Sequence, residues 1–162
     1  MTGRHIFTGT AGVYHVMHKL ACEGIHASCT HGNAPNVDIL VSSGDVSRMV
    51  AIEVKTTQDA LRFRGRGTNK LPYELQFPIG HRAAKLNSPN LLLAFVDLRG
   101  FSSPPDVYVY PSAVVAAFCS PWVDQVSYAR FHVPVAAAEA YKNNWNIVRD
   151  ALAGLVAVPA TK

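Results

Sequence analysis

The chain has 162 residues, a length typical of one domain with a buried core. Apolar residues make up 49% of the sequence, which excludes wholesale disorder, and the net charge of +4 favours a polyanionic partner. The three cysteines lack disulfide or zinc-site spacing, which is typical of reduced residues in a cytoplasmic protein. Residues 1–10 lack the apolar core of a signal peptide, and no apolar run approaches the roughly 20 residues of a membrane span, so we expect no membrane association.

The first third of the chain predicts an arm, a helix, a strand and a loop. Residues 1–9 carry no periodic pattern and are expected to form a loose arm. Thr10 can cap a helix over residues 10–22, whose apolar side chains recur at helical spacing, and Gly24 ends it. Residues 25–30 are expected to form a short strand. Residues 31–36 contain Gly, Asn and Pro and predict a loop.

Residues 37–57 predict an antiparallel hairpin. Residues 37–41 and 49–57 are mostly apolar and β-branched, and the turn formers Ser, Gly and Asp lie between them. Glu53 and Lys55 are two residues apart and therefore share a face of their strand. If the turn centres between residues 45 and 46, Asp38 lies directly opposite Glu53. Two carboxylates and an ammonium would then meet on one patch of an apolar hairpin.

Two neighbouring carboxylates repel each other, and a divalent cation relieves that repulsion. Oxygen ligands of this kind suit Mg²⁺ or Mn²⁺, with Asp38 and Glu53 as side-chain ligands and the Val54 carbonyl as a further one. Lys55 beside the metal could stabilise developing negative charge or help to deprotonate a water. The alternative is a half-exposed hairpin with an ion pair on its solvent face, although the flanking residues are apolar enough to be buried.

These residues resemble the PD-(D/E)XK nuclease superfamily, in particular its small prokaryotic endonuclease-like branch, related to Holliday-junction resolvases. The likeness extends over about residues 9–112. It rests on Gly12, on the segment that leads to Asp38, and on Glu53-Val54-Lys55 with the two threonines that follow. The resemblance implies a restriction-endonuclease-like core, Mg²⁺ held by Asp38 and Glu53, and a Lys55 that assists the nucleophilic water.

One position departs from the pattern of that superfamily. Related sequences usually place a Glu directly after the residue corresponding to Gly12, where this chain has Val13. The helical Glu normally helps to hold a metal or its water. Two functions therefore stay open: a metal-dependent endonuclease acting on DNA in restriction, repair or recombination, and a catalytically inactive module that binds nucleic acid or a protein. A structural or immunity-type interaction protein is a third interpretation.

The segment after Lys55 is polar and basic. Residues 58–70 are expected to form a mobile loop that contacts phosphates, the alternative being an ordinary solvated loop. Residues 80–86 predict a helix whose charges either extend this basic surface or merely keep the helix soluble. The predicted nucleic-acid-binding residues of the two segments are Arg62, Arg64, Arg66, Lys70, Arg82 and Lys85. DNA is the expected partner, with RNA not excluded.

The rest of the chain completes an α/β prediction: a central mixed sheet of about five strands flanked by helices. A short strand or continued loop is expected over 71–77, a fully covered strand over 91–97, a loop over 99–105 and a strand over 106–110. Pro111 begins a helix that reaches residue 118. Residues 126–133 suggest an edge strand, and 143–155 an amphipathic helix. We expect one domain over 1–162 with its core over about 9–118, and a homodimer, because cutting both strands of a duplex commonly needs two active sites.

Other groups of residues are weaker candidates for a functional site. His15 and His18 lie three residues apart on the first helix, but nothing completes a zinc set. Gly65 and Gly67 lack the Lys-Ser/Thr and the strand–turn–helix context of a phosphate-binding loop. His132 is expected to be structural.

Overall fold

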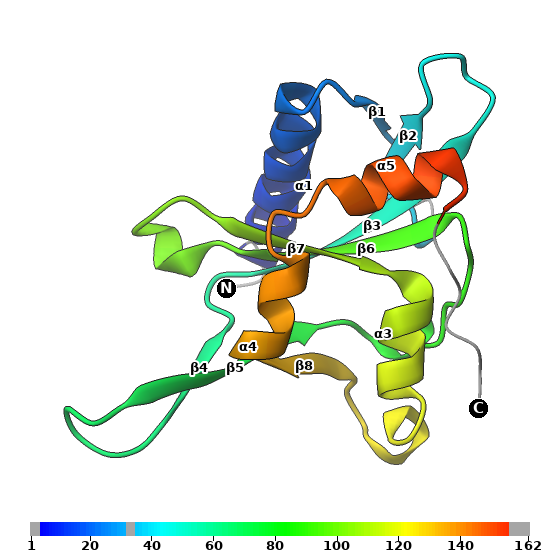
Figure 1. Cartoon of the computed structure of the whole chain (residues 1–162). Helices are drawn as coiled ribbons and strands as arrows, with labels where there is room; N and C mark the ends of the chain where they lie inside the picture. Colours follow the sequence, from blue (N-terminus) through cyan, green and yellow to red (C-terminus); the bar gives the residue numbers. More distant parts are fainter. Residues whose placement is uncertain (1–3, 32–34, 156–162) are drawn as a thin grey trace.

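The computed structural model describes residues 4–31 and 35–155 (Figure 1). Its main layer is a five-stranded sheet in the order β1-β2-β3-β6-β7. The parallel pairing of β3 with β6 makes the sheet mixed, since the other neighbours are antiparallel. This confirms the expected α/β architecture. The strands are β1 (His26–Cys29), β2 (Ile39–Ser42), β3 (Met49–Thr57), β6 (Leu91–Asp97) and β7 (Asp106–Pro111).

Two of these strands have the bounds that their composition predicts. β3 and β6 coincide with the expected ranges 49–57 and 91–97, because both are mostly β-branched or apolar runs between turn formers. All seven residues of β6 are buried, as expected for a strand covered on both faces. The bounds of β7 and of the helix after it, α3 (Ser112–Cys119), differ from the predicted bounds by no more than one residue.

Helices α1 (Arg4–Cys22) and α5 (Asn146–Ala153) cover one face of the sheet (Figure 1). Their apolar stripes pack on the side chains of β2, β3, β6 and β7 that point to this face, around Val16, Ile52 and Val148. The expectation of a loose arm before Thr10 is wrong for residues 4–9, which form the first turns of α1, so Thr10 caps nothing. Residues 1–3 of that arm, and residues 32–34 of the predicted loop, lie outside the described residues.

A second, three-stranded sheet in the order β4-β5-β8 covers the opposite face. It consists of β4 (Leu61–Arg64), β5 (Leu71–Pro78) and β8 (Arg130–Pro134). Stacked aromatic rings join it to the first sheet; the rings of Phe95 and Phe131, for example, are 4.7 Å apart. The expectation that residues 58–70 form a loop is therefore wrong at β4, which forms a hairpin with β5. The edge strand expected within 126–133 is present as β8.

Short elements fill the remaining chain. α2 (His81–Ala84) and α4 (Val135–Ala138) pack with α3 around the second sheet. Single turns of 3-10 helix form η1 (Arg99–Phe101), η2 (Val123–Gln125) and η3 (Glu139–Tyr141). The predicted C-terminal helix is shorter than 143–155, because α5 starts at Asn146 and ends before Gly154. Within the described residues, none of the helices combines the length and apolar character that crossing a bilayer requires.

Candidate functional site

The register of the β2–β3 hairpin is regular up to Ile39, which pairs with Ile52, and its continuation would set Asp38 opposite Glu53. The backbone N–H of Asp38 instead donates to the Ile52 carbonyl at 3.0 Å, so the pairing shifts by one residue at Asp38, as in a β-bulge. Regular pairing ends here, since β2 begins at Ile39 while β3 runs on to Thr57. Beyond Ile52, β3 therefore has a free edge on the β2 side, and Asp38 lies at the start of that edge.

The Asp38 carboxylate is held in the plane of the sheet by β3 itself. Its Oδ2 accepts a hydrogen bond of 2.7 Å from the backbone N–H of Val54. In a strand the N–H and C=O groups of one residue point to the same side. The Val54 carbonyl therefore faces the same free edge as the Asp38 carboxylate. Two of the three predicted metal ligands thus share one edge of β3.

Glu53 and Lys55 form an ion pair on the face of β3 opposite α1. Lys55 Nζ lies 2.5 Å from Glu53 Oε1. Glu53 pairs with Leu93 and Lys55 with Phe95, both in the core between the two sheets, so the side chains of this ion pair point toward the second sheet. Glu53 is only 5% exposed, and within residues 4–31 and 35–155 its Oε2 has no hydrogen-bond partner. A buried carboxylate oxygen without a partner is costly unless something else satisfies it.

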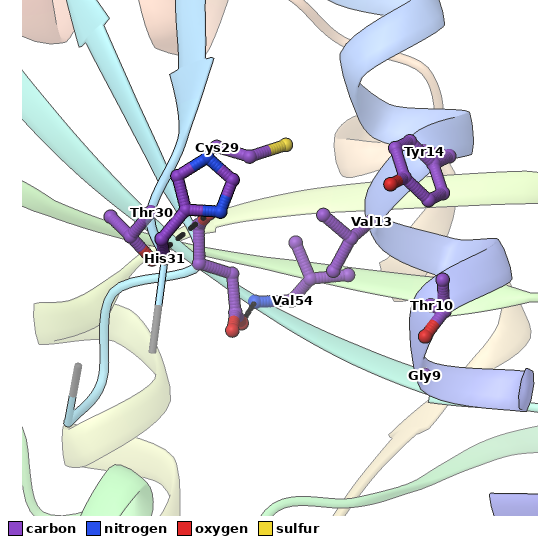
Figure 2. Close-up of a pocket in the computed structure, with 9 residues that line it drawn as sticks. Gly9, Thr10, Val13, Tyr14, Cys29, Thr30, His31 and Val54 are labelled. Atoms are coloured by element: carbon purple, nitrogen blue, oxygen red, sulfur yellow. Dashed lines mark hydrogen bonds between the residues drawn. The ribbon is translucent and has the colours of Figure 1, made fainter. Parts of the chain in front are cut away.

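A pocket of about 340 Å³ lies between α1 and the free edge of β3. Asp38 and Val54 line one side of it, and Val13 and Tyr14 of α1 line the other. Figure 2 shows Val13 reaching from the helix toward Val54. Val13, which stands where the pattern of the resembled superfamily has a Glu, therefore lines the same pocket as Asp38 and presents only methyl groups to it. Glu53 and Lys55 do not line this pocket.

Gly12 sets the distance between α1 and β3. A Cβ at this position would overlap the Thr56 hydroxyl, and it would lie 2.9 Å from Thr56 Cβ, closer than side chains normally pack. Only a glycine lets the helix approach the strand this closely. Thr56 is one of the two threonines that follow Lys55 in the motif, and its buried hydroxyl has no hydrogen-bond partner among the described residues.

The predicted basic residues fall into separate groups. Arg64, Arg66 and Lys70 are exposed on the outer half of the β4–β5 hairpin. Arg62 is half-buried at its base, where its guanidinium donates to Gln76 Oε1 and to the Asp59 and Leu61 carbonyls.

Arg82 and Lys85 follow the other end of β5. Seven residue steps along that strand cover roughly 23 Å, so these two residues do not extend the basic surface of the hairpin. The Lys85 ammonium is paired with Asp124.

Asp97 is a buried carboxylate that the sequence pattern did not single out. It lies at the carboxyl end of β6, beside Thr57 of β3. Its Oδ1 accepts the backbone N–H groups of Ala60 at 3.1 Å and Arg99 at 2.9 Å, so it fixes the start of the β4–β5 hairpin. Burial raises the pKa of Asp97 above its usual value, although these two hydrogen bonds oppose the shift.

The histidines do not assemble into a metal site. The rings of His15 and His18 are 6.5 Å apart, and burial, followed by the nearby Lys19 charge, lowers the pKa of His15. Across residues 4–31 and 35–155, no group of three or more His, Cys, Asp or Glu side chains is placed to hold a metal ion. Asp38 lies at the pocket beside α1 with Val54, whereas Glu53 points toward the second sheet. His132 contacts Glu74 at 3.1 Å, in agreement with a structural role.

Comparison with solved structures identifies the fold. The structure of a bacterial homing endonuclease, I-Ssp6803I, matches this chain with a TM-score of 0.57, covering 94% of this chain and 96% of that one. The chain has a nuclease-like fold. The sequence identity between the two is 12%, at which the likeness shows the fold alone. Neither a protein-family model nor a curated protein matches this sequence.

Proposed function

We propose that this protein is a metal-dependent endonuclease of the PD-(D/E)XK class that hydrolyses phosphodiester bonds in DNA. The observation that supports it most is the state of Glu53: a buried carboxylate with one oxygen on Lys55 and the other without a partner in the part of the chain that the structure describes. A buried carboxylate oxygen in this state calls for a further partner, such as a metal ion or a water. The nuclease-like fold and the Asp38 carboxylate held beside Val54 point to the same function.

The residues present fit a hard divalent cation. Mg²⁺ keeps several waters and needs only one or two carboxylates from the protein. In this chain Asp38 and Glu53 would supply the carboxylates and Val54 its free carbonyl. When bound, Mg²⁺ or Mn²⁺ would neutralise charge on the scissile phosphate and lower the pKa of a bound water.

Each residue then has a distinct task. Asp38, held by the Val54 N–H, presents a carboxylate whose direction is fixed before any ligand binds. Lys55 keeps the buried Glu53 charge compensated, and its side chain is still 27% exposed, so it can reach an incoming phosphate. There it orients the attacking water or offsets the negative charge that develops on the phosphate.

Val13 favours a second candidate, a catalytically inactive module on the same fold. The side chain that related enzymes use to hold a metal is replaced by methyl groups on the wall of the pocket. Such a module would bind nucleic acid or a protein partner without cutting it.

Nicking of supercoiled plasmid in Mg²⁺ or Mn²⁺ distinguishes the two. If the protein is an enzyme, the wild type should nick the plasmid and Lys55→Ala should not. Lys19→Ala, a matched change on α1 outside the site, should nick at the wild-type rate. A wild type that never nicks, together with a Val13→Glu variant that does, would establish the inactive module. A wild type and a Lys55→Ala variant that nick at equal rates would contradict the assignment of Lys55.

A homodimer remains part of the proposal, because two sites are needed to cut both strands of a duplex. Sedimentation of the protein on a linear duplex tests it. Two chains per duplex with double-strand cuts is the expected result, and one chain per duplex with nicks only would contradict it.

A further inference from the structure

The β4–β5 hairpin carries a positive charge equal to the net charge of the whole chain. Residues 61–72 contain Arg62, Arg64, Arg66 and Lys70 and no Asp or Glu, whereas the remaining sequence holds eleven basic and eleven acidic residues. A net charge of +4 distributed over the whole surface would be weak evidence for a polyanionic partner. Concentrated on one hairpin, the same charge marks a surface for a polyanion.

Among the described residues, the outer cations of this hairpin have no acidic partner. Within the described residues, the side chains of Arg66 and Lys70 form neither an ion pair nor a hydrogen bond, and the Arg64 guanidinium lies 5.0 Å from the ring of Tyr73. Five basic residues of the body, in contrast, face an acidic partner: Lys55, Lys85, Arg99, Lys142 and Arg149.

The hairpin extends away from the body of the molecule (Figure 1). Its base is anchored, since Leu75 and Phe77 are buried in the core between the two sheets and the Asp97 carboxylate accepts the Ala60 N–H. Its tip has a defined shape, because Gly65 has a φ of +110° and a Cβ there would clash with the Asn69 carbonyl. A projecting ribbon with a fixed base and tip can enter a groove without the cost of being ordered on binding.

We propose that the outer half of this hairpin, residues 63–71, enters the major groove of duplex DNA. Two strands about 4.8 Å apart, with side chains on both faces, match a groove about 12 Å wide, which is known to admit a two-stranded ribbon. Arg64 and Arg66 can contact guanine edges and phosphates, and Lys70 phosphates. The exposed ring of Phe63, on the same ribbon, can contact thymine methyl groups.

This inference deepens the proposed nuclease function, on which it rests, by assigning the hairpin as the element that contacts the major groove of the substrate. Lys55 and Arg64 are nine residues apart, so at most about 30 Å of extended chain separates them. That is less than one turn of B-DNA, about 34 Å. A hairpin in the groove would therefore place its contacts within one helical turn of a phosphate at Lys55.

Binding of a labelled duplex of about 24 base pairs, measured by fluorescence anisotropy in EDTA at several salt concentrations, tests the proposal. The triple variant Arg64→Ala/Arg66→Ala/Lys70→Ala should bind on the order of 100-fold more weakly. Its salt slope should be smaller by about 2.7, because each of the three cations that no longer neutralises a phosphate removes about 0.9. Its thermal unfolding should be unchanged, because the three side chains are exposed.

The matched control is Lys19→Ala/Arg48→Ala/Arg130→Ala, which removes the same charge from α1, from the turn before β3 and from β8. It should keep the salt slope of the wild type. Equal losses of affinity in the two triple variants would show an effect of net charge alone and would overturn the proposal. So would a salt slope that the hairpin variant leaves unchanged.

A second comparison tests the groove. A-form RNA has a deep, narrow major groove that a ribbon cannot enter. The wild type should bind the DNA duplex at least tenfold more tightly than an RNA duplex of the same sequence, and the hairpin variant should lose this preference. Competition by the major-groove ligand methyl green, and not by the minor-groove ligand netropsin, is expected. Equal binding of the two duplexes, or competition by netropsin alone, would overturn the proposal.

Failure of this inference is distinguishable from failure of the nuclease function. Lys55→Ala should still bind the duplex while losing any nicking. A protein that binds through the hairpin but never nicks would support the major-groove assignment and contradict the proposed nuclease activity. A protein that nicks in Mg²⁺ but shows no hairpin-dependent binding would support the proposed nuclease activity and contradict the major-groove assignment.

Discussion

Substitution of Glu53 by Gln should abolish stabilisation of the fold by Mg²⁺ or Mn²⁺. The replacement keeps the shape of a side chain that is only 5% exposed, and it removes the charge of the unpartnered Oε2. Lys55 can remain in place, since its side chain is partly in water and a Gln oxygen still accepts from its ammonium. The main expected change is therefore the loss of one metal ligand.

The size of the effect follows from linkage between binding and unfolding. At a metal concentration tenfold above its Kd, a site present only in the folded state adds about 1.4 kcal/mol to the free energy of unfolding. For a chain of 162 residues, each kcal/mol shifts Tm by roughly 2–4 °C. The wild type should therefore gain about 3–6 °C, and the Glu53→Gln variant should gain nothing.

Thermal unfolding by circular dichroism, with and without the metal, measures this shift. Glu139→Gln is the matched control, because it makes the same chemical change at an exposed carboxylate of η3. That variant should gain as much as the wild type. An equal gain in wild type, Glu53→Gln and Glu139→Gln would refute the reasoning, since the stabilising metal would then bind elsewhere or nonspecifically. This assay reports on the ligand set even if the protein cuts no DNA.

Three further predictions concern the scaffold. Gly12→Ala should lower the free energy of unfolding by about 1–3 kcal/mol, because its Cβ meets Thr56, and Thr56→Ala in the same chain should restore part of the loss in urea unfolding. Asp97→Asn should stabilise the protein at about pH 7 and not below about pH 3. A carboxyl whose pKa is raised on folding makes the protein less stable as pH rises from about 3.8 through the folded pKa, and an amide at this position does not titrate. Urea unfolding at several pH values should show a difference in the free energy of unfolding between variant and wild type that widens with pH. Arg149→Ala should cost less than about 1 kcal/mol, because its ion pair with Glu23 is exposed, and a larger loss of Tm would show that this contact clamps α5 to α1.

The local chemistry of the sequence determined much of the central sheet. β3 and β6 are long runs of β-branched and apolar residues between turn formers, so neighbouring residues alone specify their bounds. The turn residues of the β2–β3 hairpin likewise determined its register from Ile39 to Ser42, although the pairing shifts by one residue at Asp38. The position of Val13 on α1 was predictable from helical spacing, and its side chain does face that site.

Only the tertiary structure decided what surrounds that hairpin. β4 is four residues long and basic, and its strand conformation depends on β5, which itself pairs with β8 more than fifty residues later. Such pairings connect residues too far apart for a local pattern to record. The same holds for the approach of α1 through Gly12, for the unpartnered oxygen of Glu53 and for the projection of the hairpin. Each depends on which faces meet when distant segments pack, and this is where the chain acquires its candidate site.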